Sequence, residues 1–276
     1  MILDEQTRAE IQKENDRKAI SLDTKQHCQK ILQGIEKFDE NTSKRVIWEL
    51  VQNARDLAKK GQDGGYHVNI QIELTENQLA FSHNGKHFSF DSLTPLIKQV
   101  SSEEKEDPDA AGEFGTGFMT THKFSRILKI YGSYEIRPNT YVSLNGFKID
   151  RSSDDLPGMR KAMEEQLIEV NNLLSKDTCE EEEWTKFIYE TDNDERRAAA
   201  AEGVDAALQL MPYVMTFVDR IESCKIIKKD GTETLYKKGG IEEKDGLHVM
   251  HILKNEIPID CYYLQSEDRN DIIVLS

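Results

Sequence analysis

The clearest hydrophobic pattern in the chain runs from Arg45 to Lys60, RVIWELVQNARDLAKK. At ~3.6 residues per turn, the apolar residues of this segment fall on one stripe of a helix, with spacings of i, i+3, i+4 and i+7. The stripe consists of Ile47, Leu50, Val51, Ala54 and Leu57. A neighbouring face carries Glu49, Asn53 and Asp56. These three residues form either a solvated polar edge, which most amphipathic helices have, or a functional surface.

Short polar residues and glycines mark the expected ends of this helix. Asn41, Thr42 and Ser43 are N-cap candidates, because their side chains can accept hydrogen bonds from the first free amides. Gly61 and the DGG sequence at 63–65 predict that the helix ends just after Lys60.

Strict alternation of apolar and polar residues over 68–74 predicts a half-buried strand. Its inward residues are Val68, Ile70, Ile72 and Leu74. QLAFS, at 78–82, predicts a second strand that returns after a turn at 76–77. This strand leads directly into HNGKHF, at 83–88, which is either a plain hairpin turn or a binding loop at the end of a strand.

A short helix is expected at 90–100, followed by a polar, charged segment that we expect to be mobile. The chain then reaches AGEFGTGF, Ala111 to Phe118, with glycines at i, i+3 and i+5, and a helix is expected to begin at Phe118. A glycine-rich loop that opens onto a helix can bind phosphate through backbone amides, although such loops are also common as structure alone.

The second half of the chain predicts further strands and two long helices. We expect strands at 126–131, 133–136, 140–144 and 147–151, a helix at 155–175 and a strand at the end of EEEWTKFIYET, 181–191. An alanine-rich helix at 194–211 is expected to break at Pro212, and the apolar run YVMTFV after it predicts a strand. Residues 221–276 predict hairpin-like β-structure.

Length and composition narrow the class of protein. With 276 residues the chain is one large domain or one and a half. Its 36 basic and 51 acidic residues give a net charge of −15, which disfavours direct binding to nucleic acid or to an anionic membrane. The four cysteines, Cys28, Cys179, Cys224 and Cys261, are scattered and predict reduced thiols. With no apolar run of ~18 residues and no signal-peptide core, we expect a soluble, cytoplasmic protein.

Three motifs now stand in order: ExxxNxxD on a helix, a strand that ends in an NG loop, and a GxFGxGF loop. Together they resemble the GHKL ATPase superfamily of gyrase, heat-shock chaperones, histidine kinases and MutL. The resemblance covers about residues 40–220 and is closest to the ninety-kilodalton heat-shock chaperones and sacsin-like proteins. It implies an α+β fold, a two-layer sandwich in which a mixed sheet carries helices on one face and ATP lies between helices and loops (the Bergerat fold).

Composition, strand pattern and the resemblance together predict a division of the chain. Residues 1–40 would form a helical arm that packs on a neighbour, either a protein partner or a second copy. Residues 41–220 would form the nucleotide-binding domain. Residues 221–276 would be a β-rich extension, either the opening of a following domain or extra strands of this one.

The matched positions have implied roles in binding ATP and Mg²⁺. Glu49 would be the general base for the attacking water, Asn53 would bind the Mg²⁺ that also contacts the phosphates, and Asp56 would support the site. Thr185 would hydrogen-bond toward the base through water, although a threonine on a strand is often only a strand residue. The remaining implied nucleotide contacts are Gly85, Phe88, Gly112, Phe114, Gly115, Thr116, Gly117 and Phe118.

One position departs from the family pattern. His83 stands where the family has an aspartate that accepts a hydrogen bond from the adenine amino group, and His87 replaces a glycine. A neutral imidazole can accept through one nitrogen but cannot give a charge-assisted bond, and its N–H could donate to a guanine carbonyl.

The function that the resemblance implies is ATP binding with slow hydrolysis. It would close a lid at 101–111 and drive a conformational change in a larger protein, chaperone-like or of a defence type. The alternative is a nucleotide-gated binding or scaffold module that does not hydrolyse ATP. Glu49 argues against this alternative, since a pure binder needs no base, whereas His83 and His87 argue for it.

Overall fold

The computed structural model describes residues 23–39, 41–99, 116–265 and 272–275. Residues 23–35 are helical. The other helices are α2 (Thr42–Asp56), α3 (Phe90–Lys98), α4 (Thr116–Met119), α5 (Leu156–Asn172) and α6 (Asp194–Phe217), with 3₁₀ turns at Thr120–Lys123 and Leu173–Ser175. The strands are β1 (Lys59–Lys60), β2 (Tyr66–Leu74), β3 (Gln78–His83), β4 (Ile127–Tyr131), β5 (Ser133–Arg137), β6 (Thr140–Ser143), β7 (Phe147–Asp150), β8 (Thr185–Glu190), β9 (Ile221–Ile227), β10 (Glu233–Lys244), β11 (Leu247–Lys254), β12 (Ile257–Gln265) and β13 (Ile272–Leu275).

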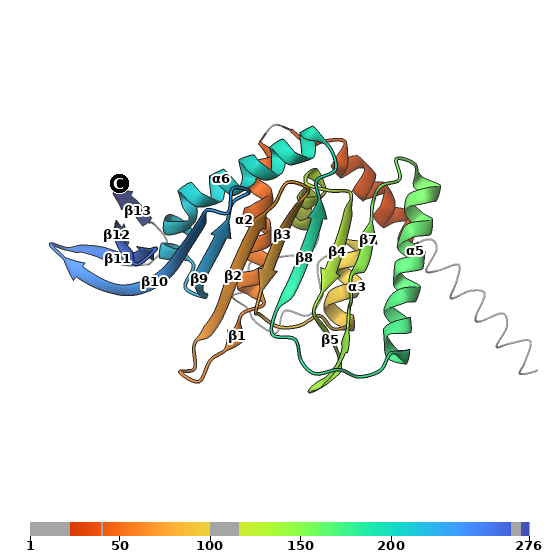
Figure 1. The fold of residues 1–276 in the computed structure, drawn as a ribbon, viewed down its shortest axis with the longest axis horizontal. Coiled ribbons are helices and arrows are strands. Elements are labelled where there is room, and N and C mark those ends of the chain that lie inside the picture. The colour runs from red at the N-terminus through yellow and green to blue at the C-terminus, as the bar shows by residue number, and fades with distance from the viewer. Residues whose placement is uncertain (1–22, 40, 100–115, 266–271, 276) are drawn as a thin grey trace, which may run out of the picture.

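One large mixed sheet organises these elements (Figure 1). Its strand order is β13-β12-β11-β10-β9-β2-β3-β8-β4-β7, with β1 paired to β2. β2 and β9 are parallel, and β3 is antiparallel to both β2 and β8. β5 and β6 form a separate two-stranded sheet. The chain is therefore an α+β protein.

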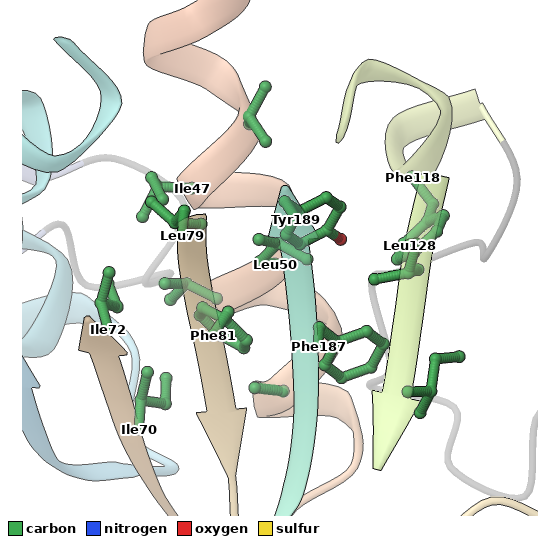
Figure 2. Packing of buried hydrophobic residues seen from close by; sticks show 14 of the residues in the cluster. Ile47, Leu50, Ile70, Ile72, Leu79, Phe81, Phe118, Leu128, Phe187 and Tyr189 are labelled. Carbon is green, nitrogen blue, oxygen red and sulfur yellow. The ribbon is translucent and has the colours of Figure 1, made fainter. Parts of the chain in front are cut away.

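The core lies between the sheet and the helices that cover it. Every inward residue predicted for β2 is buried, as are all the residues predicted for the apolar stripe of α2 except Leu57, which is partly exposed. Figure 2 shows Ile47 and Leu50 of α2 packed over Leu79 and Phe81 of β3. The predicted patterns of the first strand and the first long helix are confirmed.

The predicted C-terminal end of the organising helix is wrong. α2 ends at Asp56, and Lys59 and Lys60 form β1, which pairs with β2. The glycines at 61–65 make the turn of this hairpin, in which the Gly61 amide donates to the carbonyl of Gly65. The helix cannot continue because the Leu57 carbonyl accepts the amide of Lys86, at 2.6 Å, from the loop after β3.

The predicted N-cap of α2 also needs correction. Asn41 has helical backbone angles and makes no capping hydrogen bond with its side chain. Instead the Thr42 hydroxyl donates to the carboxylate of Asp39, at 2.8 Å, and so holds the chain as it enters the helix.

The predicted break at Pro212 and the strand after it are also wrong. α6 is one helix of 24 residues that contains Pro212. A proline inside a helix has no N–H to give to the carbonyl four residues earlier, here that of Leu208. The hydroxyl of Tyr236, on β10, donates to this carbonyl at 2.7 Å. A contact from the sheet thus satisfies the group that proline leaves unpaired.

The β-rich segment at 221–276 continues the central sheet, because β9 pairs with β2. In Figure 1, α6 and α2 lie close together and α6 extends over this side of the sheet. Of the predicted N-terminal arm, the described part is held to the body through Cys28 and Ile31, which are buried. None of the described helices combines the length and apolarity needed to cross a membrane.

Candidate functional site

The polar face of α2 meets the end of the glycine-rich motif. Glu49 keeps 23% of its side chain exposed, and its carboxylate lies against Gly117 at the start of α4. A Cβ atom at position 117 would lie 2.0 Å from Glu49 Oε2, so a larger residue there would displace the Glu49 carboxylate. The structure therefore brings together Glu49 and Gly117, two residues that were assigned to one site from the sequence.

The other two residues of this face carry buried polar atoms or a mostly buried side chain. Asn53 lies one turn after Glu49, and its Nδ2 atom is buried without a hydrogen-bond partner in the described structure. The side chain of Asp56 is 8% exposed, and its carboxylate accepts from the guanidinium of Arg55 at 3.2 Å.

His83 and Thr185 lie side by side at the ends of neighbouring strands. They are paired directly in the antiparallel register of β3 and β8. Directly paired residues point to the same face of a sheet, and here that face also carries Phe81 and Phe187, which are buried against the helices. Both His83 and Thr185 are 1% exposed, and Thr185 Oγ1 has no hydrogen-bond partner.

The hydrogen bonds of His83 define its protonation. The amide of Gly85 donates to His83 Nδ1 at 3.2 Å, so Nδ1 is an acceptor. Burial, together with the nearby His87 and Lys59, lowers the pKa of His83 to about 3, so the ring is neutral at pH 7. The single ring proton is therefore on Nε2, which is buried without a partner.

Backbone contacts fix the loop that follows His83. Asn84 Oδ1 accepts from the amide of Asn69 on β2 at 2.7 Å, and the Asn84 amide donates back to the Asn69 carbonyl. Gly85 packs on the end of α2, where a Cβ atom would lie 2.5 Å from the Leu57 carbonyl oxygen. The loop leads into α3, so it is not a hairpin turn. The contacts with Asn69 and Leu57 join distant segments and gave no signal in the sequence.

Phe88 and Phe118, both assigned to nucleotide binding from the sequence, lie in an aromatic cluster around Phe187. Their ring centroids are 5.9 and 6.3 Å from that of Phe187, and the ring of His83 is 5.8 Å away. Both phenylalanines are almost completely buried. Their direct role in this structure is to pack the core beneath the site. Phe187 was not singled out, although the alternation in TKFIYE marks it as an inward residue.

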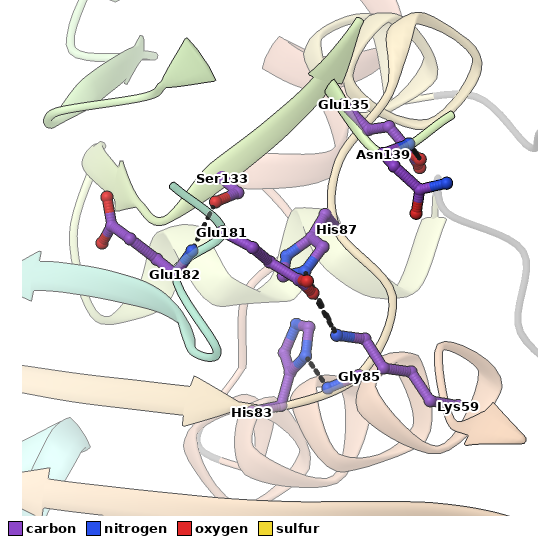
Figure 3. A network of polar contacts seen from close by, with 9 residues as sticks. All are labelled: Lys59, His83, Gly85, His87, Ser133, Glu135, Asn139, Glu181 and Glu182. Atoms are coloured by element: carbon purple, nitrogen blue, oxygen red, sulfur yellow. Dashed lines mark hydrogen bonds and ion pairs between the residues drawn. The ribbon is translucent and has the colours of Figure 1, made fainter. Parts of the chain in front are cut away.

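A polar network lies beside His83 (Figure 3). Glu181 Oε1 lies 2.6 Å from His87 Nε2 and 3.2 Å from Lys59 Nζ, and Lys59 Nζ lies 3.1 Å from the same nitrogen of His87. The hydrogen bonds from His87 and Lys59 lower the pKa of Glu181. Sequence reasoning missed Lys59 and Glu181, because nothing in a linear pattern connects three such distant segments.

Other predicted residues lie outside the described residues. These are Gly112, Phe114 and Gly115, together with the predicted lid at 101–111. Thr116 begins α4, and the predicted helix at 118–125 is one short α-helix followed by a 3₁₀ turn.

The described residues do not form a ready-made metal centre. Within the described ranges, no group of three or more histidine, cysteine or carboxylate side chains is placed to hold a metal ion. Magnesium needs few protein ligands, because water and phosphate oxygens complete its coordination. Glu49 and Asn53 lie one turn apart on α2, so this helix face carries one carboxylate and one amide oxygen, both of the ligand types that Mg²⁺ takes.

A cavity of about 620 Å³ lies away from this site. It is bounded by the start of α3, the β5–β6 hairpin and the end of α5, with Phe90, Tyr134 and Leu174 in its walls. None of the residues assigned to nucleotide binding lines it.

Comparison with known proteins adds little to this geometry. No protein family model matches the chain, and no curated protein matches it. The solved structures that match include the N-terminal domain of a DNA repair protein, which is 14% identical in sequence. The match covers 87% of this chain and 72% of that chain, with a TM-score of 0.35. A TM-score of this size does not show a shared family.

Proposed function

We propose that the chain binds ATP together with Mg²⁺ and hydrolyses it slowly, as a GHKL-type domain with the Bergerat fold. Nucleotide binding would drive a conformational change in a larger protein. The strongest support is that residues from separate sequence motifs lie in contact with each other. Glu49 contacts Gly117, and His83 lies beside Thr185.

Unpaired polar atoms add support to this proposal. Asn53 Nδ2, His83 Nε2 and Thr185 Oγ1 are all buried without a partner. Such atoms cost ~1–3 kcal/mol each, and a bound ligand can recover that cost. Other buried atoms without a partner, for example Thr94 Oγ1, lie outside the three motifs, whereas these three belong to residues that the motifs assign to the site.

Each of these residues has its own role in binding or hydrolysis. Glu49 is the general base, a role that contributes ~10²–10⁴-fold to a rate, and its partial exposure leaves it open to a water molecule. When bound, Mg²⁺ would neutralise charge on the phosphates, with Asn53 as its protein ligand. Gly117, with no side chain, lets the Glu49 carboxylate lie against the start of α4.

Calorimetry with a non-hydrolysable ATP analogue, with and without Mg²⁺, tests the proposal. We expect the wild-type chain to bind the analogue more tightly with Mg²⁺, and Asn53→Ala to lose at least tenfold in affinity under the same conditions. Asn172→Ala, at the exposed end of α5, is the matched control and should bind like wild type. Absence of binding by the wild type, or unchanged binding by Asn53→Ala, would contradict the proposal.

A further inference from the structure

The hydrogen-bonding capacity of His83 is fixed by the backbone around it. If the proton were on Nδ1, two N–H groups would face each other across the 3.2 Å contact with the Gly85 amide. Gly85 cannot turn away easily, because Asn84 is bonded to Asn69 and the Lys86 amide to Leu57. His83 therefore presents Nε2–H, a donor, from a side chain that is 1% exposed.

The group next to His83 can adapt to this donor. Thr185 is paired directly with His83 across β3 and β8, and its buried hydroxyl, which has no partner, can donate or accept. The pair thus offers one fixed donor and one hydroxyl that can adapt.

We propose that His83 reads the base of the bound nucleotide as a hydrogen-bond donor, so that the site prefers 6-oxopurine nucleotides, those of guanine and hypoxanthine, to adenine nucleotides. The inference rests on the proposed function, because it requires a nucleotide base beside His83. The amino group of adenine is itself a donor and would face Nε2–H, whereas the carbonyl of a 6-oxopurine accepts from it. His83 is then a specificity-determining residue.

Substitution of His83 tests this inference directly. Calorimetry should compare non-hydrolysable analogues of ATP and GTP on the wild-type chain, on His83→Asp and on His83→Asn. We expect the wild type to bind the GTP analogue at least as tightly as the ATP analogue. His83→Asp replaces the donor with an acceptor and should shift the affinity ratio toward the ATP analogue by tenfold or more. His83→Asn, which carries both a donor and an acceptor, should lie between them.

A matched control and a second readout keep the test decisive if His83→Asp folds poorly. His67→Asn, on the partly exposed face of β2, should leave the ratio unchanged. In ¹⁵N NMR spectra of the wild type, the His83 ring should be in the Nε2–H form, and the Nε2 proton should shift when the GTP analogue binds. An Nδ1–H ring, or the same ratio in all His83 variants, would overturn this inference alone. Failure of both analogues to bind the wild type would overturn the proposed function as well.

Discussion

The contact between Glu49 and Gly117 leads to a prediction about turnover. Glu49→Gln keeps the size of the side chain but removes its ability to take a proton from water. We expect ATP hydrolysis to fall by ~10²-fold or more, within the range for a general base, while ATP binding stays within a few-fold of wild type. Release of phosphate and calorimetry on the same samples measure the two effects.

The exposed Glu36→Gln is the control for this substitution and should retain full turnover. If the wild-type chain binds ATP but Glu49→Gln hydrolyses it at the wild-type rate, Glu49 is not the base. If the wild type binds ATP and shows no turnover at all, the alternative of a non-hydrolysing module is favoured.

Two buried histidines predict how stability depends on pH. Burial lowers the pKa of both His83 and His122 to about 3. Below about pH 6.5 the unfolded chain takes up protons on these rings, whereas the folded chain does not until near pH 3. The free energy of unfolding should therefore fall on acidification, by up to about 1.4 kcal/mol per pH unit for each histidine. Urea unfolding at pH 7, 6 and 5 measures this slope.

Variants separate the histidines from other titrating groups. The carboxylates whose pKa values are lowered act mainly below about pH 4.5, outside this window. His67, whose pKa is raised by its hydrogen bond with Asp63, acts within the window but in the opposite direction, because its protonation stabilises the folded chain. His83→Asn and His122→Asn should each flatten the slope between pH 6 and pH 5, even if they lower stability at pH 7. An unchanged slope in both variants would mean that the rings are not buried and neutral in the folded chain.

At the scale of an element, the stability of α6 around Pro212 depends on the hydroxyl group of Tyr236. Tyr236→Phe removes only the donor that satisfies the Leu208 carbonyl, which Pro212 leaves without a helical partner. An unpaired carbonyl costs ~1–3 kcal/mol when it is buried, and this contact is partly buried, which favours the lower end of that range. We expect Tyr236→Phe to lower the free energy of unfolding by about that amount, as measured by urea denaturation.

The double variant Pro212→Ala with Tyr236→Phe isolates the cause. Alanine restores an N–H that can bond to the Leu208 carbonyl, so the loss from Tyr236→Phe should be much smaller in the alanine background. Equal losses in the two backgrounds would show that the hydroxyl acts in some other way.

The same element shows what the sequence can and cannot predict. The alternation in β2 and the stripe of α2 are local patterns. The structure follows them because each pattern puts the apolar residues on one face, and that face is buried. The break at Pro212 was predicted wrongly because the compensating Tyr236 is 24 residues away, as was the end of α2 because Lys86 takes the Leu57 carbonyl. The candidate site shows the same contrast between local patterns and contacts that depend on the fold. Its motifs can be read from the sequence, whereas the contact with the Gly85 amide, which determines which nitrogen of His83 carries the proton, cannot.

For the whole molecule, the structure predicts that the nucleotide site cannot be separated from the strands that follow Arg220. β9 lies against β2 at the centre of the sheet, and α6 packs over β9 and the strands beyond it. The described part of this segment contributes seven side chains that are at most 2% exposed: Ile221, Cys224, Ile226, Tyr236, Val249, Met250 and Ile252. Large apolar side chains contribute ~1.5–3 kcal/mol each on burial, so together they approach the ~5–15 kcal/mol of net stability of a typical domain.

A chain that ends at Arg220 should therefore fail to fold, because it exposes the edge of β2 and the underside of α6. We expect it to be aggregated or to lack a cooperative thermal transition, as judged by gel filtration and circular dichroism. A chain that ends at Gln265 is the control, because among the described strands it lacks β13, which lies at the far edge of the sheet and pairs with β12. It should keep its transition within a few degrees of the full chain. A monomeric 1–220 chain with a full cooperative transition would show that residues 41–220 form a domain by themselves, as the sequence resemblance implied, and that β9–β13 only add to its edge.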